Sequence, residues 1–251
     1  MPFSGETMNG IIKSVSAIVL TIVLVSVIGA CVMPKSVASE SGTAKLQVYV
    51  SEYYAKGSSV GISLKNTGTA EITGTPTISV HTKDGAFVSG VPTMAMIQTL
   101  QPGAGINFTW DQKDMYGNQV PDGVYVVIAK FGGLSVLSTF KIGVGSTKHI
   151  ETLTYINYTA QRAEIYVWNT GTTSITGYFN FYVYNANGEV VYSYTTSKKY
   201  TLKPGEYGVH YWNIVSTTGL SVGSGEYYTV CAVTNPSSTS NHAIAHELFT
   251  L

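Results

Sequence analysis

An internal repeat constrains the fold of this chain more than any other feature of its sequence. Six short motifs of the first copy recur in the second copy, in the same order, at an offset of 103 or 102 residues. Because order and spacing hold over roughly sixty residues, the sequence predicts two copies of one structural unit. The matched motifs are Asn66-Thr67-Gly68-Thr69 and Asn169-Thr170-Gly171-Thr172, Ile72-Thr73-Gly74 and Ile175-Thr176-Gly177, Asp84-Gly85 and Asn187-Gly188, Leu100-x-Pro102-Gly103 and Leu202-x-Pro204-Gly205, Trp110 and Trp212, and Gly123-x-Tyr125 and Gly225-x-Tyr227.

Each copy has the pattern of short β-strands separated by turns. Residues 60–64 and 163–167 alternate apolar and polar side chains, as half-buried strands do. The Asn-Thr-Gly-Thr motif suits a turn because Asn and Gly tolerate positive φ, and the Asp-Gly and Asn-Gly dipeptides are typical of tight hairpins. About seven strands in roughly 100 residues, with no helical period, predict an immunoglobulin-like sandwich for each copy. We therefore expect a mostly-β protein with tandem sandwiches over residues 46–146 and 147–251.

The composition excludes a basic nucleic-acid-binding protein and an intrinsically disordered one. Lys and Arg number 14, Asp and Glu number 14, and the formal net charge is zero, so no surplus of positive charge is available for phosphate groups. Hydrophobic residues make up 44% of the chain and aromatic residues 12%, which is enough to fill packed cores. We therefore expect folded units and no nucleic-acid partner.

A membrane-length apolar segment precedes the repeat. Residues 14–33 contain no charged side chain. As an α-helix, these 20 residues span about 30 Å, the thickness of the hydrocarbon core of a bilayer. In lipid, a helix satisfies every backbone hydrogen-bonding group within one segment. The sequence predicts an apolar helix over residues 15–34, ended by Pro34, and a small, polar linker over residues 35–45.

Three interpretations of this segment involve no polymer. Ser36-Val37-Ala38 suits the cleavage site of a secretory signal peptide, which would remove the apolar segment. Ile28-Gly29-Ala30-Cys31 looks like a lipobox, and Cys31 would then hold a lipid anchor. An uncleaved helix would be a simple membrane anchor. The residues of the segment leave these alternatives open.

The start of the apolar segment resembles that of archaeal type IV pilins and archaellins. The resemblance rests on Lys13-Ser14-Val15-Ser16-Ala17-Ile18-Val19, followed by Thr21. In that family a prepilin peptidase cuts before the apolar run, so the resemblance implies a cut between Ser14 and Val15 and a leader over residues 1–14. It also implies that the apolar helix stays on the mature protein and forms a filament core. The core positions would be Val15, Ile18, Val19, Ile22, Val25 and Ile28.

The same resemblance implies an extracellular structural protein. Its expected partners are other copies of this chain in a helical homopolymer, and the membrane before assembly. Adhesion or surface fibre formation is the biology that the family implies, with a surface glycan or a host or partner cell as the ligand. The alternative is a membrane- or lipid-anchored cell-surface protein whose sandwiches recognise glycans or a protein partner.

The chain lacks the sequence motifs of catalytic sites. It has no nucleophile elbow, P-loop or dinucleotide-binding fingerprint, so we expect no enzyme and no cofactor. His242 and His246 could share a metal ion on a helix, but we expect exposed polar side chains there and no metal. Asp111, Asp114 and Asp122 could supply oxygen ligands to Ca²⁺. Because the second copy has no matching acids, we expect these aspartates to form turns instead.

Two features of the repeat predict core residues. Trp110 and Trp212 occupy equivalent positions, so we expect both to fill a sandwich core rather than to stack on a sugar. Cys231 takes the place of Ala129 in the repeat, so we expect a small buried residue and no disulfide to Cys31.

Two further features predict surface residues. Tyrosines crowd the second copy, and some of them must point outward on alternating strands, where a rigid amphipathic ring suits contacts with protein or sugar. Asn107 and Asn157 begin N-glycosylation sequons, which matter if the chain is exported. The tyrosines concerned are Tyr155, Tyr158, Tyr166, Tyr178, Tyr182, Tyr184, Tyr192, Tyr194, Tyr200, Tyr207 and Tyr211.

Overall fold

The computed structural model of the chain describes residues 42–144, 147–238 and 242–251. Every helix or strand assigned in these ranges is a β-strand, which confirms the prediction of a mostly-β protein. The expected leader (1–14) and apolar helix (15–34) lie outside the described residues, and so does most of the linker. Within the described ranges, no helix is long and apolar enough to cross a bilayer.

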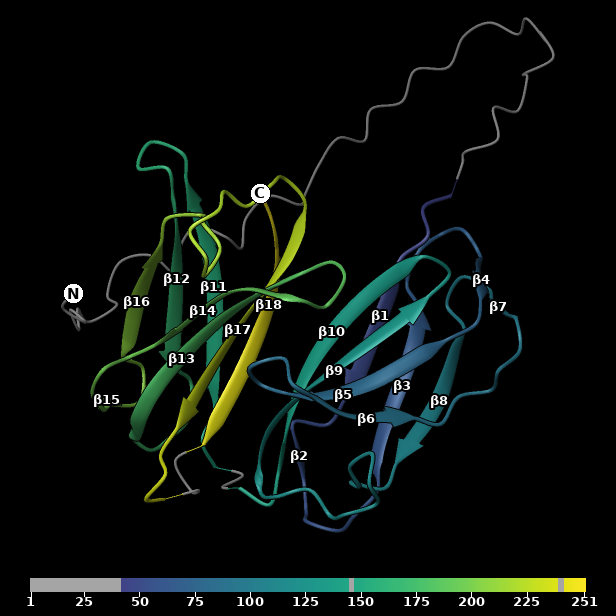
Figure 1. Ribbon diagram of the computed structural model, residues 1–251, viewed down its shortest axis with the longest axis horizontal. Coiled ribbons are helices and arrows are strands. Elements are labelled where there is room, and N and C mark those ends of the chain that lie inside the picture. The colour runs from purple at the N-terminus through teal and green to yellow at the C-terminus, as the bar shows by residue number, and fades with distance from the viewer. Residues whose placement is uncertain (1–41, 145–146, 239–241) are drawn as a thin grey trace, which may run out of the picture.

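Residues 42–144 form the first sandwich, in which two sheets pack over a shared core (Figure 1). The smaller sheet has the strand order β1-β3-β8, and the larger sheet has the order β2-β10-β9-β5-β6. Strands β4 and β7 pair with each other. The strands are β1 (Leu46–Val50), β2 (Tyr53–Tyr54), β3 (Val60–Asn66), β4 (Ile72–Gly74), β5 (Thr77–Thr82), β6 (Phe87–Val91), β7 (Gln98–Leu100), β8 (Gly105–Trp110), β9 (Gly123–Phe131) and β10 (Leu134–Ile142).

Residues 147–251 form the second sandwich, except for residues 239–241, which are not described. Its smaller sheet has the order β11-β12-β16, and its larger sheet has the order β14-β13-β17-β18, with β15 also paired to β13. The strands are β11 (Ile150–Asn157), β12 (Arg162–Asn169), β13 (Ile175–Asn185), β14 (Val190–Thr195), β15 (Tyr200–Leu202), β16 (Tyr207–Trp212), β17 (Glu226–Thr234) and β18 (Ala243–Thr250).

The two sandwiches repeat the same structure. Once strands of two or three residues are set aside, each has seven strands in its described part, as the sequence pattern predicts. The Asp-Gly and Asn-Gly dipeptides connect β5 to β6 and β13 to β14, with Gly85 at φ 90° and Gly188 at φ 80°. Trp110 and Trp212 are each 1% exposed, which confirms that both fill a core. Cys231 is fully buried as predicted, and burial raises the pKa of its thiol.

An equivalent tyrosine closes the same corner of each sandwich. The Tyr125 hydroxyl donates to the Pro121 carbonyl at 2.5 Å, and the Tyr227 hydroxyl donates to the Gly223 carbonyl at 2.8 Å. Both tyrosines stand near the start of a central strand and bond to the backbone four residues upstream, as in the tyrosine corner of immunoglobulin-type sandwiches.

A buried asparagine holds the Asn-Thr-Gly-Thr turn of each copy. The Asn66 side chain donates to the carbonyls of Ala70 (2.8 Å) and Leu100 (2.9 Å) and accepts from the amide of Gly68 (2.9 Å). Asn169 makes the same three bonds, to Thr173, Leu202 and Gly171. Neither the asparagines nor the glycines of this motif adopt positive φ, so the expected reason for the turn is wrong. Side-chain hydrogen bonds, rather than backbone freedom, fix it.

Replacing Asn66 with alanine is expected to lower the free energy of unfolding by about 2 kcal/mol, because it leaves buried backbone groups without partners. Asn169→Ala should cost a similar amount, since the bonds are equivalent. Urea denaturation of the full chain in detergent measures both. Asn107→Ala, on an exposed site, is the control. A change below about 0.5 kcal/mol at Asn66 would contradict the structural role.

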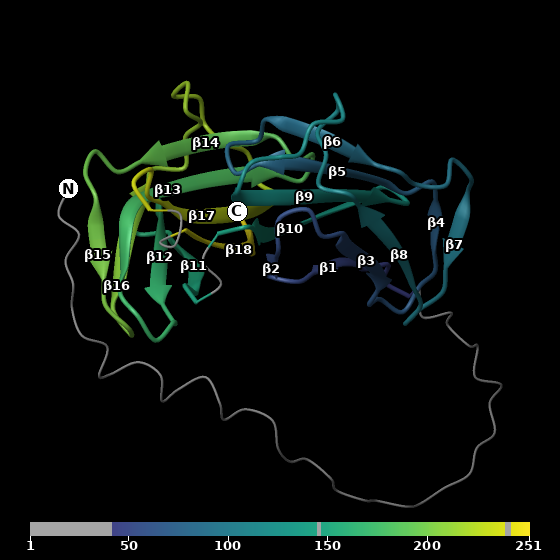
Figure 2. The same ribbon diagram turned by 90° about the horizontal axis from the view of Figure 1, so that it is seen from below.

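The two sandwiches lie side by side and share a third apolar cluster at their junction (Figure 2). It forms between the outward faces of the two larger sheets. For this reason β9 is buried on both faces: Tyr125 and Val127 point into the first core, whereas Val126 and Ile128 point into the junction. The cluster comprises Val124, Val126, Ile128, Leu137, Tyr182, Tyr184, Val230, Ala232 and Ile244.

Each hairpin turn touches the opposite sandwich. A Cβ atom on Gly85 would lie 2.7 Å from the Val190 side chain, and a Cβ atom on Gly188 would lie 2.8 Å from that of Ile128. Glycine is therefore required at both turns by the positive φ and by the close approach of the other sandwich. The equivalent turns thus both contribute to the junction, although they contact different strands of the opposite sandwich, β14 and β9.

A charged group reinforces the connection between the sandwiches. The fully buried Lys141 ammonium donates to Glu52 (2.7 Å) and to the Lys148 carbonyl (2.8 Å). The other oxygen of the Glu52 carboxylate lies 2.9 Å from Nδ1 of His149. Glu52 and Lys141 belong to the first sandwich, whereas Lys148 and His149 begin the second. The two sandwiches are thus joined by packing, hydrogen bonds and charge.

Candidate binding face

His242 and His246, considered above as a metal-binding pair, make separate hydrogen bonds in the structure. His246 stands in strand β18, so it and His242 do not share a helix face. His246 Nδ1 lies 3.0 Å from the Thr139 hydroxyl of the first sandwich, and His242 Nε2 lies 3.3 Å from the Asn235 carbonyl. Both rings are half-buried, so the expectation of exposed side chains is wrong. No group of three or more metal-ligating side chains occurs among the described residues.

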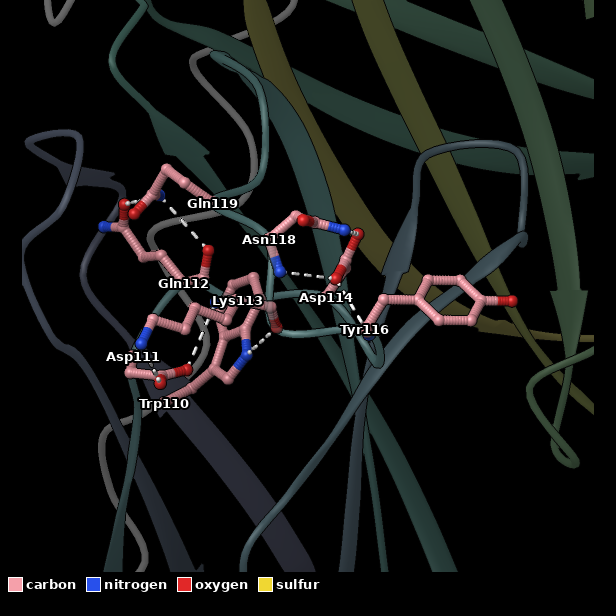
Figure 3. A network of polar contacts seen from close by, with 8 residues as sticks. All are labelled: Trp110, Asp111, Gln112, Lys113, Asp114, Tyr116, Asn118 and Gln119. Carbon is pink, nitrogen blue, oxygen red and sulfur yellow. Dashed lines mark hydrogen bonds and ion pairs between the residues drawn. The ribbon is translucent and has the colours of Figure 1, made fainter.

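The acidic loop after Trp110 uses its carboxylates to form turns (Figure 3). The Asp114 carboxylate accepts from the amides of Tyr116 and Asn118, both at 2.9 Å. These bonds, led by the one from the Asn118 amide, hold the pKa of Asp114 below its usual value. Asp111 accepts from the Lys113 amide at 3.2 Å. Asp122 instead pairs with Lys56 at 3.0 Å.

The two glycosylation sequons differ in their surroundings. Asn107 is exposed in β8 and borders a shallow groove on the smaller sheet of the first sandwich. Asn157 is half-buried at the end of β11. Its amide donates to Glu164 at 3.1 Å, and its carbonyl accepts from the Ala160 amide at 2.9 Å. A glycan at Asn157 would replace one hydrogen of the amide nitrogen that donates to Glu164, whereas a glycan at Asn107 alters no side-chain bond that the structure describes.

The crowded tyrosines divide between the interior and the surface, as predicted. Tyr182 and Tyr184 are buried in the junction between the sandwiches. Several others project from the outer face of the smaller sheet of the second sandwich, where a tryptophan joins them. We call this surface the aromatic face; it consists of Leu153 and Tyr155 on β11, Tyr166 and Trp168 on β12, and Tyr207 and Tyr211 on β16.

Three rings form the centre of the aromatic face. Tyr166 and Trp168 pack nearly parallel, with ring centroids 5.6 Å apart and an angle of 19° between their planes. Tyr207 leans against both, at 5.9 and 6.1 Å. Such contacts fix the ring orientations, so the centre is rigid before anything binds to it.

Charged groups border these rings. The Glu164 carboxylate accepts from the hydroxyl of Tyr166 (2.9 Å) and from Arg162 (3.0 Å), whose guanidinium lies 4.0 Å from the centre of the Tyr211 ring. Burial alone would raise the pKa of Glu164, but hydrogen bonds from Tyr166, Arg162 and Asn157 outweigh it and the pKa is lowered. Burial, with the bond to Glu164, raises the pKa of Tyr166 to about 12. Glu164 is therefore an anion and Tyr166 a neutral donor at neutral pH.

A shallow hollow of about 620 Å³ opens beside Trp168. Trp168 and Leu153 give it apolar walls, and Glu151 stands directly across from Trp168 in the β11–β12 register. The turn that Asn169 holds forms its rim. The hollow is lined by Glu151, Thr152, Leu153, Trp168, Asn169, Thr170, Gly171 and Gly205. An aromatic wall with a few polar groups at its edge is the usual composition of a small-ligand site.

The aromatic face is absent from the first copy, although the two sheets have the same architecture. On strands β3 and β8 the first copy keeps apolar residues toward its core, whereas the outer face of these two strands has small or polar ones. The outer face of β1 has an exposed tyrosine, Tyr49, opposite Ser63. Gly61, Ser63 and Lys65 stand where the second copy has Glu164, Tyr166 and Trp168, and Gly105, Asn107 and Thr109 stand where it has Tyr207, Val209 and Tyr211. The fold thus does not require aromatic residues on these two strands, and the cluster of Tyr166, Trp168 and Tyr207 is a property of the second copy alone.

Comparisons with known proteins do not place the chain in a family. No family model matches the sequence, and no curated protein matches it. Among solved structures, the chain resembles latent PorU from Porphyromonas gingivalis, with 13% identity and a TM-score of 0.28 over 81% of this chain and 20% of that one. It also resembles the E. coli chaperone DraB (12% identity, TM-score 0.32, 83% and 96%) and red sea bream transglutaminase (9%, 0.29, 82% and 31%). The chain spans only about a fifth of the PorU chain, and similarities this weak bear on no argument below.

Sequence reasoning missed Trp168. It considered sugar stacking only for Trp110 and Trp212, both of which are buried. The alternation along residues 162–168 contained the signal: Ala163, Ile165 and Val167 point inward, so Trp168 must point outward.

Proposed function

We propose that this chain is a structural subunit of an extracellular filament of the type IV pilus kind. The observation that supports the proposal best is a combination: a membrane-length apolar segment over residues 14–33 followed by two sandwiches fused into one unit by a buried junction. We further infer that each sandwich is of the immunoglobulin-like class, that residues 15–34 form an α-helix, and that the helix is the polymerising element. The proposal assigns no reaction and no cofactor to the chain.

The physical reason for a polymer lies in the apolar helix. A helix that leaves the bilayer exposes its apolar side chains to water unless another surface buries them. Copies of the same helix packed side by side supply that surface, and the sandwiches then form the outer layer. Two sandwiches that share a buried apolar junction suit this role because each subunit then presents the same outer surface.

The mature N-terminus and the filament test the proposal together. Mass spectrometry of the native protein should find a chain that begins at Val15, and electron microscopy should find filaments. Ile22→Asp places a charge in the apolar helix, which disfavours its burial by several kcal/mol, and should abolish filaments. Ser36→Asp, in the linker, is the control and should preserve them. A mature chain that begins near Ser39, or filaments that persist in Ile22→Asp, would overturn the proposal.

A second candidate is a membrane- or lipid-anchored binding protein, which the aromatic face favours. This protein would remain monomeric in detergent, and its N-terminal fragment would contain either a lipid on Cys31 or the uncleaved helix. Filaments from purified protein argue against it, whereas lipid on Cys31 argues for it.

A further inference from the structure

We propose that the hollow beside Trp168 binds a neutral glycan, whose sugar ring packs on the indole and whose hydroxyls bond to the rim. The inference goes beyond the structural role proposed above. It does not depend on a filament, because the hollow lies within one copy of the chain.

The walls of the hollow match one side of a sugar ring. A pyranose has faces of C–H groups, which pack on an aromatic ring with loss of water from both surfaces. Trp168 supplies such a ring, and Leu153 extends the apolar wall. The parallel contact with Tyr166 and the tilted contact with Tyr207 hold the indole in place, so little side-chain entropy is lost when a ligand binds.

The rim matches the hydroxyls at the edge of the sugar. Glu151 offers carboxylate oxygens, which accept hydrogen bonds, and the Thr170 hydroxyl either donates or accepts. The Thr152 hydroxyl already donates to the Tyr166 carbonyl at 2.9 Å, so it can only accept from a ligand. Since the Asn169 side chain is bonded to Thr173, Leu202 and Gly171, this rim is fixed in the unliganded chain.

The charge of the aromatic face selects neutral glycans. Glu164 is paired with Arg162, whereas no ion pair of Glu151 occurs among the described residues. Glu151 is the charged side chain in the lining of the hollow, so the hollow has one negative charge beside the indole, which repels carboxylated or sulfated sugars. The same carboxylate argues against a packed protein partner, because the centres of protein interfaces are depleted in Glu.

The volume of the hollow and a comparison with the first copy also support a ligand site beside Trp168. About 620 Å³ lies within the range of roughly 300–1,000 Å³ common for small-ligand sites. In the first copy Lys65 replaces Trp168 and Gly105 replaces Tyr207, so the equivalent surface lacks the stacked rings, and its exposed aromatic residue is Tyr49 on β1. One copy of the repeat thus has the site, and the other supplies a matched position for a control.

The test uses the full-length chain, kept in solution by a detergent without a sugar headgroup, on an array of neutral and acidic oligosaccharides. We expect binding to neutral glycans. Trp168→Ala should weaken binding to the best neutral oligosaccharide by about tenfold or more, as truncation of a central aromatic contact does, whereas Trp168→Phe should retain part of it. Lys65→Ala, at the equivalent position of the first sandwich, should leave affinity unchanged. Urea denaturation of each variant checks that the second sandwich stays folded.

A second variant tests the role of charge, because it should gain binding to acidic glycans. Glu151→Gln keeps the size of the side chain and removes its charge, so acidic glycans that the natural chain rejects should bind. The proposal is overturned if the natural chain binds no neutral glycan, if Trp168→Ala binds as tightly as the natural chain, or if Trp168→Ala changes only association between copies. Each outcome is read on detergent-dispersed chains, so a failure here is distinct from an absence of filaments.

Discussion

Replacing Tyr184 with alanine is expected to lower the free energy of unfolding by about 4 kcal/mol, because it empties a large buried site at the junction of the sandwiches. Tyr184 is fully buried, and its hydroxyl donates to the Lys83 carbonyl of the first sandwich at 2.7 Å. Burial raises the pKa of this hydroxyl, so it stays a neutral donor. The ring also lies beside the hairpin at Gly85, so its loss weakens the contacts between the sandwiches as well as the second sandwich itself.

Urea denaturation with tryptophan fluorescence measures this effect, since Trp110 reports on the first sandwich and Trp168 and Trp212 on the second. The natural chain should unfold in one transition, whereas Tyr184→Ala should separate the transitions of the two sandwiches. Tyr184→Phe removes only the hydroxyl and should cost about 1 kcal/mol. His81→Ala, at the equivalent position of the first copy, is the matched control. Equal stabilities of Tyr184→Ala and the natural chain would show that the junction contributes nothing.

The internal repeat made most of the β architecture predictable from the sequence, whereas the packing of the two sandwiches against each other was not predictable. Landmarks such as Trp110 and Trp212 fixed the alignment of the copies, and burial at both positions followed from the need to fill two equal cores. Residues 124–129 are apolar at every position, which indicates a strand buried on both faces. The sequence could not identify which residues cover the second face of this strand, because an apolar residue that points outward does not indicate which segment packs against it.

The aromatic face was predictable only as a tendency. The abundance of tyrosine in the second copy indicated that some rings face outward, but not that Tyr166, Trp168 and Tyr207 meet on one sheet. That contact depends on the register between β12 and β16, in which Trp168 pairs with Tyr207. Comparison of the two copies position by position would have revealed it, because Lys65 and Gly105 show that the fold needs no rings there.

Acidification from pH 6.5 to pH 4 is expected to destabilise the chain, because two histidines are held neutral in the folded state. Burial lowers the pKa of His210 to about 4, and burial does the same for His246. The His210 ring stacks on the rings of Phe181 and Tyr194, with centroids 4.6 and 4.3 Å away. A protonated His210 would therefore have little contact with water.

The direction of this change in stability follows from the number of protons that the folded and unfolded states bind. In the unfolded chain a histidine titrates near its ordinary pKa of about 6.5, so between pH 6.5 and pH 4 the unfolded state binds more protons than the folded state. Stability therefore falls as pH falls, by up to about 1.4 kcal/mol per pH unit for each histidine. Burial raises the pKa of Glu247, so protonation of this group favours the folded state at low pH and offsets part of the loss.

A substitution separates the contribution of His210 to the pH dependence of stability from that of the other titratable groups. His210→Phe keeps an aromatic ring in the stack but cannot be protonated, so it should reduce the dependence of stability on pH between pH 6.5 and pH 4 by up to about 1.4 kcal/mol per pH unit. Burial also lowers the pKa of His81 and of His242, so part of the pH dependence should remain. It also leaves the Tyr192 hydroxyl without its 2.8 Å partner, which should cost about 1 kcal/mol at neutral pH. The informative quantity is therefore the slope of unfolding free energy against pH, measured by urea denaturation in detergent at several pH values. An unchanged slope in His210→Phe would mean that His210 takes up its proton equally in the folded and unfolded chain, contrary to its burial among aromatic rings.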